Sequence, residues 1–301
     1  MVGALLAAML MAAPPQDTPT AELSVTDLEE IVVEGRRLEE AARVFVDEIG
    51  EPPPGARPGR WNTPICLSVW GMQRRYAEYM IDRISVAALE AGAEVEGPGC
   101  RPNVFIMATD NGRQLAASLV EQFQIGFRPT NGGTNLGRRA LENFRTSDAP
   151  VRWWHVTFPV DPESGDEAMA RPGQDAPVTR VRDVSRLRSN VRYDIVWGLV
   201  IIDVSRVGDA SLEALADYAA LAALTQLNPD ANLTHADSIA NLFQPGNTVD
   251  SLTSWDRDYL KALYESRTDR ATRHQQINDI VRGLVAERTN GEGETAPGPE
   301  E

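Results

Sequence analysis

The segment LEALADYAALAALTQL, Leu212 to Leu227, is apolar on nearly every side of the helix that its composition predicts. Six alanines in it allow neighbouring elements to approach the helix backbone closely. A helix that is apolar all round is stable inside a domain and not on its surface. Ser211 is a suitable N-cap for it. The chain must therefore build a core around this helix. Its clearly polar side chains are few: Glu213, Asp217, Thr225 and Gln226.

Strands and helices are expected to alternate on both sides of this segment. The apolar run RYDIVWGLVIIDV, residues 192–204, gives the strongest strand signal. Strand-helix-strand-helix order predicts an α+β fold in which a mixed, partly parallel β-sheet packs with helices. Asp110 is expected to cap the helix that follows the strand 104–110. Further strands are predicted at 30–37, 65–71 and 151–160, and further helices at 38–49, 73–93 and 112–123.

The domain organisation follows from shifts in composition. Residues 1–13 are predicted to be a signal peptide. Their apolar run of 12 residues is too short to span a bilayer and has the length of a signal-peptide core. A buried N-terminal helix is the alternative. Residues 14–29 form an expected mobile leader, and 30–288 a single α+β domain. Within it, 161–190 is polar and is expected to be an excursion or a lid. The Gly-, Pro- and Glu-rich residues 289–301 predict a disordered acidic tail.

Charge limits the partners that the chain can take. A formal net charge of −15 over 301 residues argues against nucleic acid and against anionic membrane surfaces, which need clustered Lys and Arg. No stable membrane insertion is expected. No cofactor or metal is expected either, because the three histidines form no helical pair and the Gly-rich stretch 132–137 lacks a Gly-Lys-Ser/Thr ending.

The two cysteines bear on the compartment. Cys66 and Cys100 are predicted to form a disulfide, since an even pair in an exported chain is most simply a bridge. Closing this loop stabilises by about 3–4 kcal/mol in the chain-entropy description. The predicted location is therefore periplasmic or secreted. Two unpaired buried thiols are the alternative.

In the order of its elements, the region 195–265 resembles the active-site region of zincin metallopeptidases. In these enzymes a helix with the pattern H-E-x-x-H-x-x-G-x-x-H holds zinc and a glutamate activates the bound water. Residues 238–243 resemble the turn beneath the metal, and Thr253 with Asp256 resembles a capping box that opens the closing helix. Aligned without gaps, the pattern falls on Ala216, Asp217, Ala220, Ala223 and Gln226.

The resemblance implies a zincin-like three-layer arrangement whose zinc ligands are absent. The region 195–265 is also similar to uncharacterised exported bacterial domains whose corresponding helix lacks zinc ligands. On this interpretation the chain is a non-catalytic envelope protein, more a binding protein than an enzyme, with a peptide or protein partner in the old substrate groove. The alternatives are a plain core helix, or a hydrolase with a non-standard site near Asp217 that uses His155 and His235. A degenerate zincin places Asp217 on the floor of a cleft, whereas a plain core helix leaves it exposed or paired with an arginine.

The candidate binding residues are Asp217, Gln226, Trp153 and His155, and no catalytic residue is assigned. Trp153 and His155 are expected to share a face of their strand because alternate residues do so, while Trp154 points to the other face. Both could then line a groove. The alternative is a tryptophan packed in the core beside a half-exposed histidine.

Overall fold

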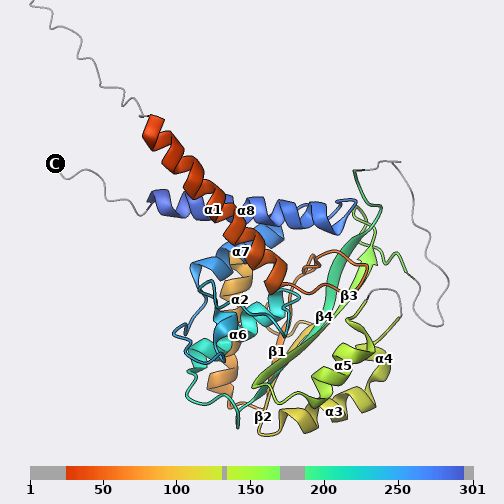
Figure 1. Ribbon diagram of the computed structural model, residues 1–301. Coiled ribbons are helices and arrows are strands. Elements are labelled where there is room, and N and C mark those ends of the chain that lie inside the picture. The colour runs from red at the N-terminus through yellow and green to blue at the C-terminus, as the bar shows by residue number, and fades with distance from the viewer. Residues whose placement is uncertain (1–24, 131–133, 170–186, 295–301) are drawn as a thin grey trace, which may run out of the picture. The chain divides into compact units, whose positions relative to one another are not determined.

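A computed structural model describes residues 25–130, 134–169 and 187–294 (Figure 1). Two compact units divide the chain, Met1–Arg37 and Leu38–Glu301. Of the first unit the structure describes the start of one helix, and the second unit contains the sheet and the apolar core. The helices are α1 (Val25–Ile49), α2 (Arg74–Ala91), α3 (Gly112–Gln122), α4 (Gln124–Phe127), α5 (Gly137–Thr146), α6 (Leu212–Leu224), the 3-10 helix η1 (Ile239–Asn241), α7 (Ser254–Glu265) and α8 (Arg273–Glu294).

Four strands form one mixed sheet in the order β1-β2-β4-β3. The strands β1, β2 and β4 run parallel, and β3 is an antiparallel edge strand beside β4. This arrangement confirms the expected α+β class with a mixed sheet packed against helices. The strands are β1 (Leu67–Trp70), β2 (Val104–Thr109), β3 (Val151–Val160) and β4 (Arg192–Asp203).

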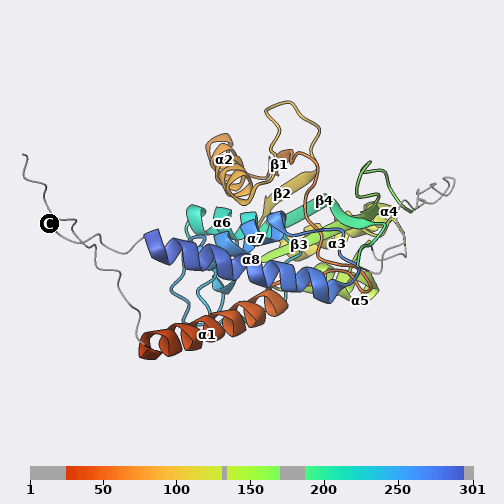
Figure 2. The same cartoon turned by 90° about the horizontal axis from the view of Figure 1, so that it is seen from above.

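Helices cover both faces of this sheet (Figures 1 and 2). Alternate residues of β4 belong to two separate apolar clusters because successive side chains of a strand point to opposite faces. Val200 and Ile202 pack with α2, α6 and α7 in the larger cluster. Leu199 and Ile201 pack with α3 and α5 in the smaller one. We call these two faces of the sheet the α6 face and the α3 face.

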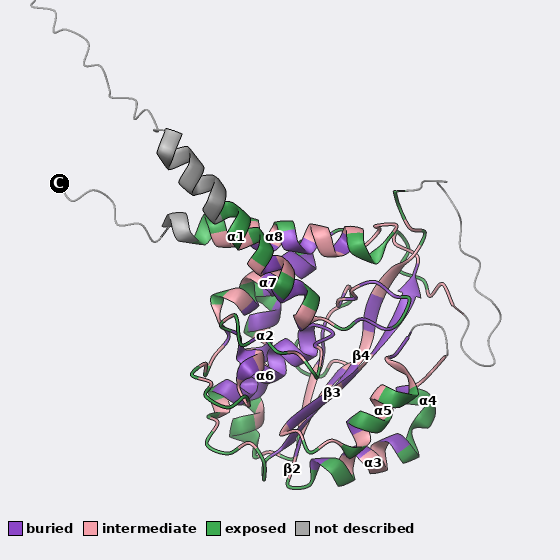
Figure 3. Ribbon diagram, in the orientation of Figure 1, coloured by how far each residue is buried: buried purple, intermediate pink, exposed green. Residues whose placement is uncertain are grey.

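Helix α6 lies in the middle of the larger cluster, as its composition predicts. All of residues 214–224 are buried, and the helix is purple along this length in Figure 3. Ser211 caps it through a bond from the Ala214 amide. The capping box of Thr253 and Asp256 at the start of α7 is also present. Both capping predictions are confirmed.

Three local predictions are wrong. Residues 30–37 lie in α1 and not in a strand, because three β-branched residues among Leu, Glu and Arg do not outweigh the helix preference of their neighbours. The N-cap of α3 is Asn111 and not Asp110, since the Asn111 side chain accepts from the Gln114 amide. Helix α8 continues to Glu294, past the expected start of the tail, because its middle packs against α7.

The expected polar excursion is described in part. A tight turn follows β3, in which Asp161 N donates to Asp166 O and Val160 pairs with Glu167. Residues 170–186 lie outside the described residues. So do 1–24 and 295–301, which contain the predicted signal peptide, most of the leader and the end of the tail. Among the described residues, no helix has the length and apolar character needed to cross a bilayer.

Candidate functional site

Asp217, the residue on which the sequence alternatives differ, is an internal structural carboxylate. It is 1% exposed and accepts two hydrogen bonds from Arg83 of α2, at 2.5 and 2.8 Å. Its Oδ2 also accepts from the Leu252 amide at 2.7 Å. The bond to Asp217 raises the pKa of Arg83. The pairing with an arginine is the arrangement expected of an ordinary core helix.

The other positions of the zincin pattern are equally enclosed. Ala216 and Ala220 are fully buried, and Ala223 is 1% exposed. Helix α6 lies near the antiparallel edge strand, since Trp153 of β3 contacts Tyr218 with ring centroids 6.0 Å apart. Because α6 is covered on all sides, these positions present no open face to a substrate.

Trp153 and His155 share the α6 face of β3, as expected, and Trp154 points to the α3 face. Trp153 Nε1 donates to Leu227 O at 2.8 Å. The imidazole of His155 lies so close to Gly198 that a Cβ there would be 3.3 Å from His155 Cδ2. Burial lowers the pKa of His155 to about 4, and a hydrogen bond with the Ala223 backbone opposes this shift only in part. Both residues serve the packing of α6 against the sheet.

Gln226 and His235 are held by separate contacts. Gln226 is 7% exposed, and its Oε1 accepts from Gly59 N at 2.7 Å beside a cavity of about 20 Å³, room for roughly one water. His235 Nδ1 lies 3.7 Å from Glu48. Among the described residues, no hydrogen bond or ion pair joins any two of Asp217, His155 and His235. The structure therefore does not assemble them into one site.

The carboxyl ends of β2 and β4 are a second place to look for a site, because open sheets with parallel strands often bind ligands there. Asp203 fills this position and is 2% exposed. Its carboxylate accepts from Ser205 Oγ at 2.6 Å and from Gly112 N, at the start of α3, at 2.8 Å. Burial raises the pKa of Asp203, but these bonds outweigh it and the net pKa is lowered. The protein's own carboxylate thus occupies the anion-binding end of α3.

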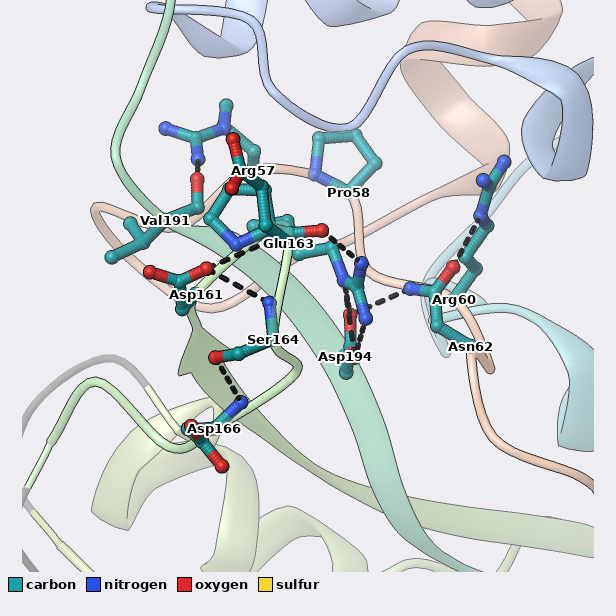
Figure 4. Close-up of polar contacts among 12 residues, drawn as sticks. Arg57, Pro58, Arg60, Asn62, Asp161, Glu163, Ser164, Asp166, Val191 and Asp194 are labelled. Carbon is teal, nitrogen blue, oxygen red and sulfur yellow. Dashed lines mark hydrogen bonds and ion pairs between the residues drawn. The ribbon is translucent and has the colours of Figure 1, made fainter. Parts of the chain in front are cut away.

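A polar network fixes the opposite end of β4 (Figure 4). Asp194, 4% exposed, accepts from Asn62 Nδ2 at 2.6 Å and from Arg192 Nε at 2.9 Å. Arg57 donates to the Val191 carbonyl. The network joins the segment before β1, the turn after β3 and the start of β4. Most of its polar groups are engaged with one another, so it is a structural anchor for the start of β4.

Next to this anchor a β-bulge exposes apolar side chains on the α3 face. Val156 pairs with Trp197 and Thr157 with Ile195, so Val196 is an extra residue in β4. As a result, Val196 and Trp197 both pack on the α3 face although they are neighbours in sequence. Bulges often redirect side chains in this way beside functional sites.

The redirected residues form the floor of a hollow of about 710 Å³. Val156 and Phe158 of β3 complete this floor. Ile125 and Gly126 of the short helix α4 line one wall. We call this hollow the apolar groove. Its volume is typical of a ligand-binding pocket, and its lining is mostly apolar with a few polar groups, as such pockets are.

A second wall of the groove, Arg101 to Asn103, is held by covalent and polar contacts. Cys66 and Cys100 form the predicted disulfide, with a Cα–Cα distance of 6.0 Å. Asn103 adds two hydrogen bonds, since its Oδ1 accepts from Cys66 N at 2.8 Å and its Nδ2 donates to Pro64 O at 3.0 Å. The disulfide thus fixes one wall of the apolar groove as well as closing a chain loop.

A second hollow, of about 670 Å³, is also lined by α4 and shares Ile125 with the apolar groove. We call it the arginine hollow because Arg128, Arg138 and Arg145 line it, together with Glu121 and Glu142. Arg145 is paired with Glu142 at 2.6 Å. The two hollows form a candidate binding site along α4.

Sequence patterns do not reveal this site. Its lining residues come from five separate segments, 101–103, 120–129, 138–145, 156–158 and 196–197, and the bulge at Val196 interrupts the strand that is predicted at 192–204. The usable signal is the apolar pair Phe123 and Ile125 at the end of the predicted helix 112–123; these side chains are 57% and 74% exposed.

Comparisons of this chain with protein-family models, with curated proteins and with solved structures find no match.

Proposed function

We propose that the chain is an exported, non-catalytic binding protein that holds a peptide segment of a partner protein in the apolar groove. The observation that carries the proposal is the groove of about 710 Å³, floored by apolar side chains that a bulge directs to one face. The disulfide between Cys66 and Cys100 supports an oxidising compartment such as the cell envelope.

The exposed side chains beside the groove support a macromolecular partner. Ile125 is 74% exposed at its rim, and Trp197 is half-buried in its floor. Covering large apolar side chains is favourable, at about 1.5–3 kcal/mol for each one fully buried. An extended segment with apolar side chains would gain this energy, and aromatic residues such as Trp197 commonly dominate such contacts.

The alternative hydrolase near Asp217 gains no support. Asp217 already accepts bonds from Arg83 and Leu252, and a catalytic carboxylate needs a free oxygen within reach of a substrate. The groove lies on the α3 face of the sheet, whereas Asp217 lies in α6, which packs on the opposite face.

A titration with a defined probe tests the proposal. The probe is a fluorescent dodecapeptide whose first half contains Leu, Val and Phe and whose second half contains Ser and Gln. Fluorescence polarisation should show saturable binding. The substitution Ile125→Asp should weaken binding at least about tenfold, because it removes an apolar contact and places a charge at the rim.

Leu89→Asp is the matched control. Leu89 is also exposed, at 59%, but it lies on α2, outside the groove. Binding that Leu89→Asp abolishes and Ile125→Asp leaves intact would overturn the proposal. So would a wild-type dimer, seen by sedimentation, that Ile125→Asp dissociates, because a second copy would then occupy the groove.

A further inference from the structure

The arginine hollow differs in charge from the chain that contains it. The whole chain carries −15. The hollow is lined by three arginines and two glutamates, a net charge of +1. At physiological salt, charges beyond about 8 Å are largely screened, so a ligand in the hollow responds to these nearby groups and not to the distant acidic surface.

Arg138 is the cation of the hollow that is available to a ligand. Arg145 is already paired with Glu142. Arg138, by contrast, is exposed and has no hydrogen bond or ion pair within the described residues. Its guanidinium has five donors in a planar fork that suits a carboxylate. A ligand carboxylate in the hollow would accept from two of these donors in parallel.

The two hollows meet at Ile125, so one extended segment can enter both. The apolar groove takes apolar side chains, and the arginine hollow favours negative charge. From this charge complementarity we infer that the bound segment is an acidic peptide: apolar residues in the groove, followed by Glu or Asp side chains that pair with Arg138. This inference deepens the proposed function and rests on it.

Three dodecapeptide probes test the inference. They share one apolar half, containing Leu, Val and Phe, and differ in the second half, which contains Glu, Gln or Lys. The wild-type chain should bind the Glu probe about two- to fivefold more tightly than the Gln probe, the range expected of one exposed ion pair. The preference should shrink as salt is raised from about 50 to about 500 mM, which span physiological ionic strength by a factor of about three on each side.

Arg138→Glu and Arg139→Glu form a matched pair of variants. Both arginines are exposed neighbours on α5 with no ion pair within the described residues, but only Arg138 is among the residues lining the hollow. Arg138→Glu should abolish the preference for the Glu probe and create one for the Lys probe. Arg139→Glu should keep the wild-type order.

The outcomes separate the two proposals. Suppose that the Gln probe binds in an Ile125-dependent way and the Glu probe binds no more tightly. Peptide binding in the apolar groove is then supported, and the inference that the ligand is acidic is contradicted. If the two arginine variants behave alike, the contact with Arg138 is likewise overturned. If none of the three probes binds, the proposed function falls together with this inference.

Discussion

Charged and ionisable residues that the sequence marks as candidates for chemistry are used in this protein to hold the core. Asp217 joins α6 to α2 through Arg83, and Asp203 holds the start of α3. His155 is kept neutral under Gly198. Each such group is costly to bury without its contacts, so its removal should lower the stability of the fold.

Asp217→Ala should destabilise the fold by about 1–3 kcal/mol, because it leaves the Leu252 amide without an acceptor and removes the buried partner of Arg83. Glu213→Ala removes the exposed partner of the same Arg83, at 2.8 Å, and should cost less than about 1 kcal/mol. Urea unfolding measures both. Equal effects of the two substitutions would show that Asp217 has no special structural role.

The lowered pKa of His155 predicts that the stability of the fold depends on pH. Its folded-state pKa of about 4 lies below the unfolded value near 6.5, so the unfolded chain binds more protons between these two pH values. Stability from the neutral imidazole is therefore complete above pH 6.5 and is lost as pH falls towards 4. About 2 kcal/mol should be lost between roughly pH 7.5 and pH 5. In His155→Leu this part of the decrease should vanish; an unchanged pH profile would contradict the assignment.

At the scale of elements, close approach of backbones determines how the sheet and helices fit. Gly71 links β1 to α2 with a φ of +78°, and a Cβ at this position would overlap the carbonyl oxygen of Ala108 in β2. Gly92 ends α2 with a φ of +91°, and a Cβ there meets open space. Alanine at Gly92 would therefore add conformational strain alone, whereas alanine at Gly71 would add both strain and steric overlap.

Gly92→Ala should cost about 1 kcal/mol, the penalty of a left-handed alanine. Gly71→Ala adds the overlap with Ala108 and should cost about 3 kcal/mol or more. Thermal and urea unfolding of the two variants give the comparison. Equal losses would mean that β1 and β2 move apart at no cost.

The disulfide should matter for both stability and binding. Opening the Cys66–Cys100 bridge, or replacing both cysteines by serine, should lower the unfolding free energy by about 3–4 kcal/mol. Loss of the disulfide should also weaken binding of the uncharged Gln probe, because Arg101 to Asn103 form a wall of the apolar groove. Polarisation measured on folded, reduced protein tests this, and an unchanged affinity would show that Asn103 alone holds the wall.

Sequence patterns predict most of these elements but not the site. Long periodic segments such as 192–204 and 212–227 are predicted correctly because their apolar pattern is set by burial. The prediction of a strand at 30–37 is wrong, because a short β-branched run does not outweigh the helix preference of the residues on both sides of it. The groove is lined by residues of a one-residue bulge and of the four-residue helix α4, and neither element leaves a pattern in the sequence.

On the scale of the whole molecule, seven of the ten large exposed apolar side chains of the described residues fall into two groups. Phe123 and Ile125 lie at α4, beside the two hollows. Trp70 and the α2 side chains Tyr76, Tyr79, Val86 and Leu89 form the second group. Within the described residues, the first group adjoins hollows with both apolar and basic lining, which is why we assign the partner to it.

The two surfaces can be separated in one measurement, a ¹⁵N NMR titration of the intact chain with the neutral dodecapeptide. Each of the six tryptophans gives one indole N–H signal. Trp197 lies in the floor of the groove, and Trp70 lies at the end of β1, 61% exposed. The Trp197 indole and Ile125 amide signals should shift with one saturating curve while the Trp70 indole stays in place. A shift of Trp70 without Trp197 would contradict the assignment of the apolar groove as the binding site.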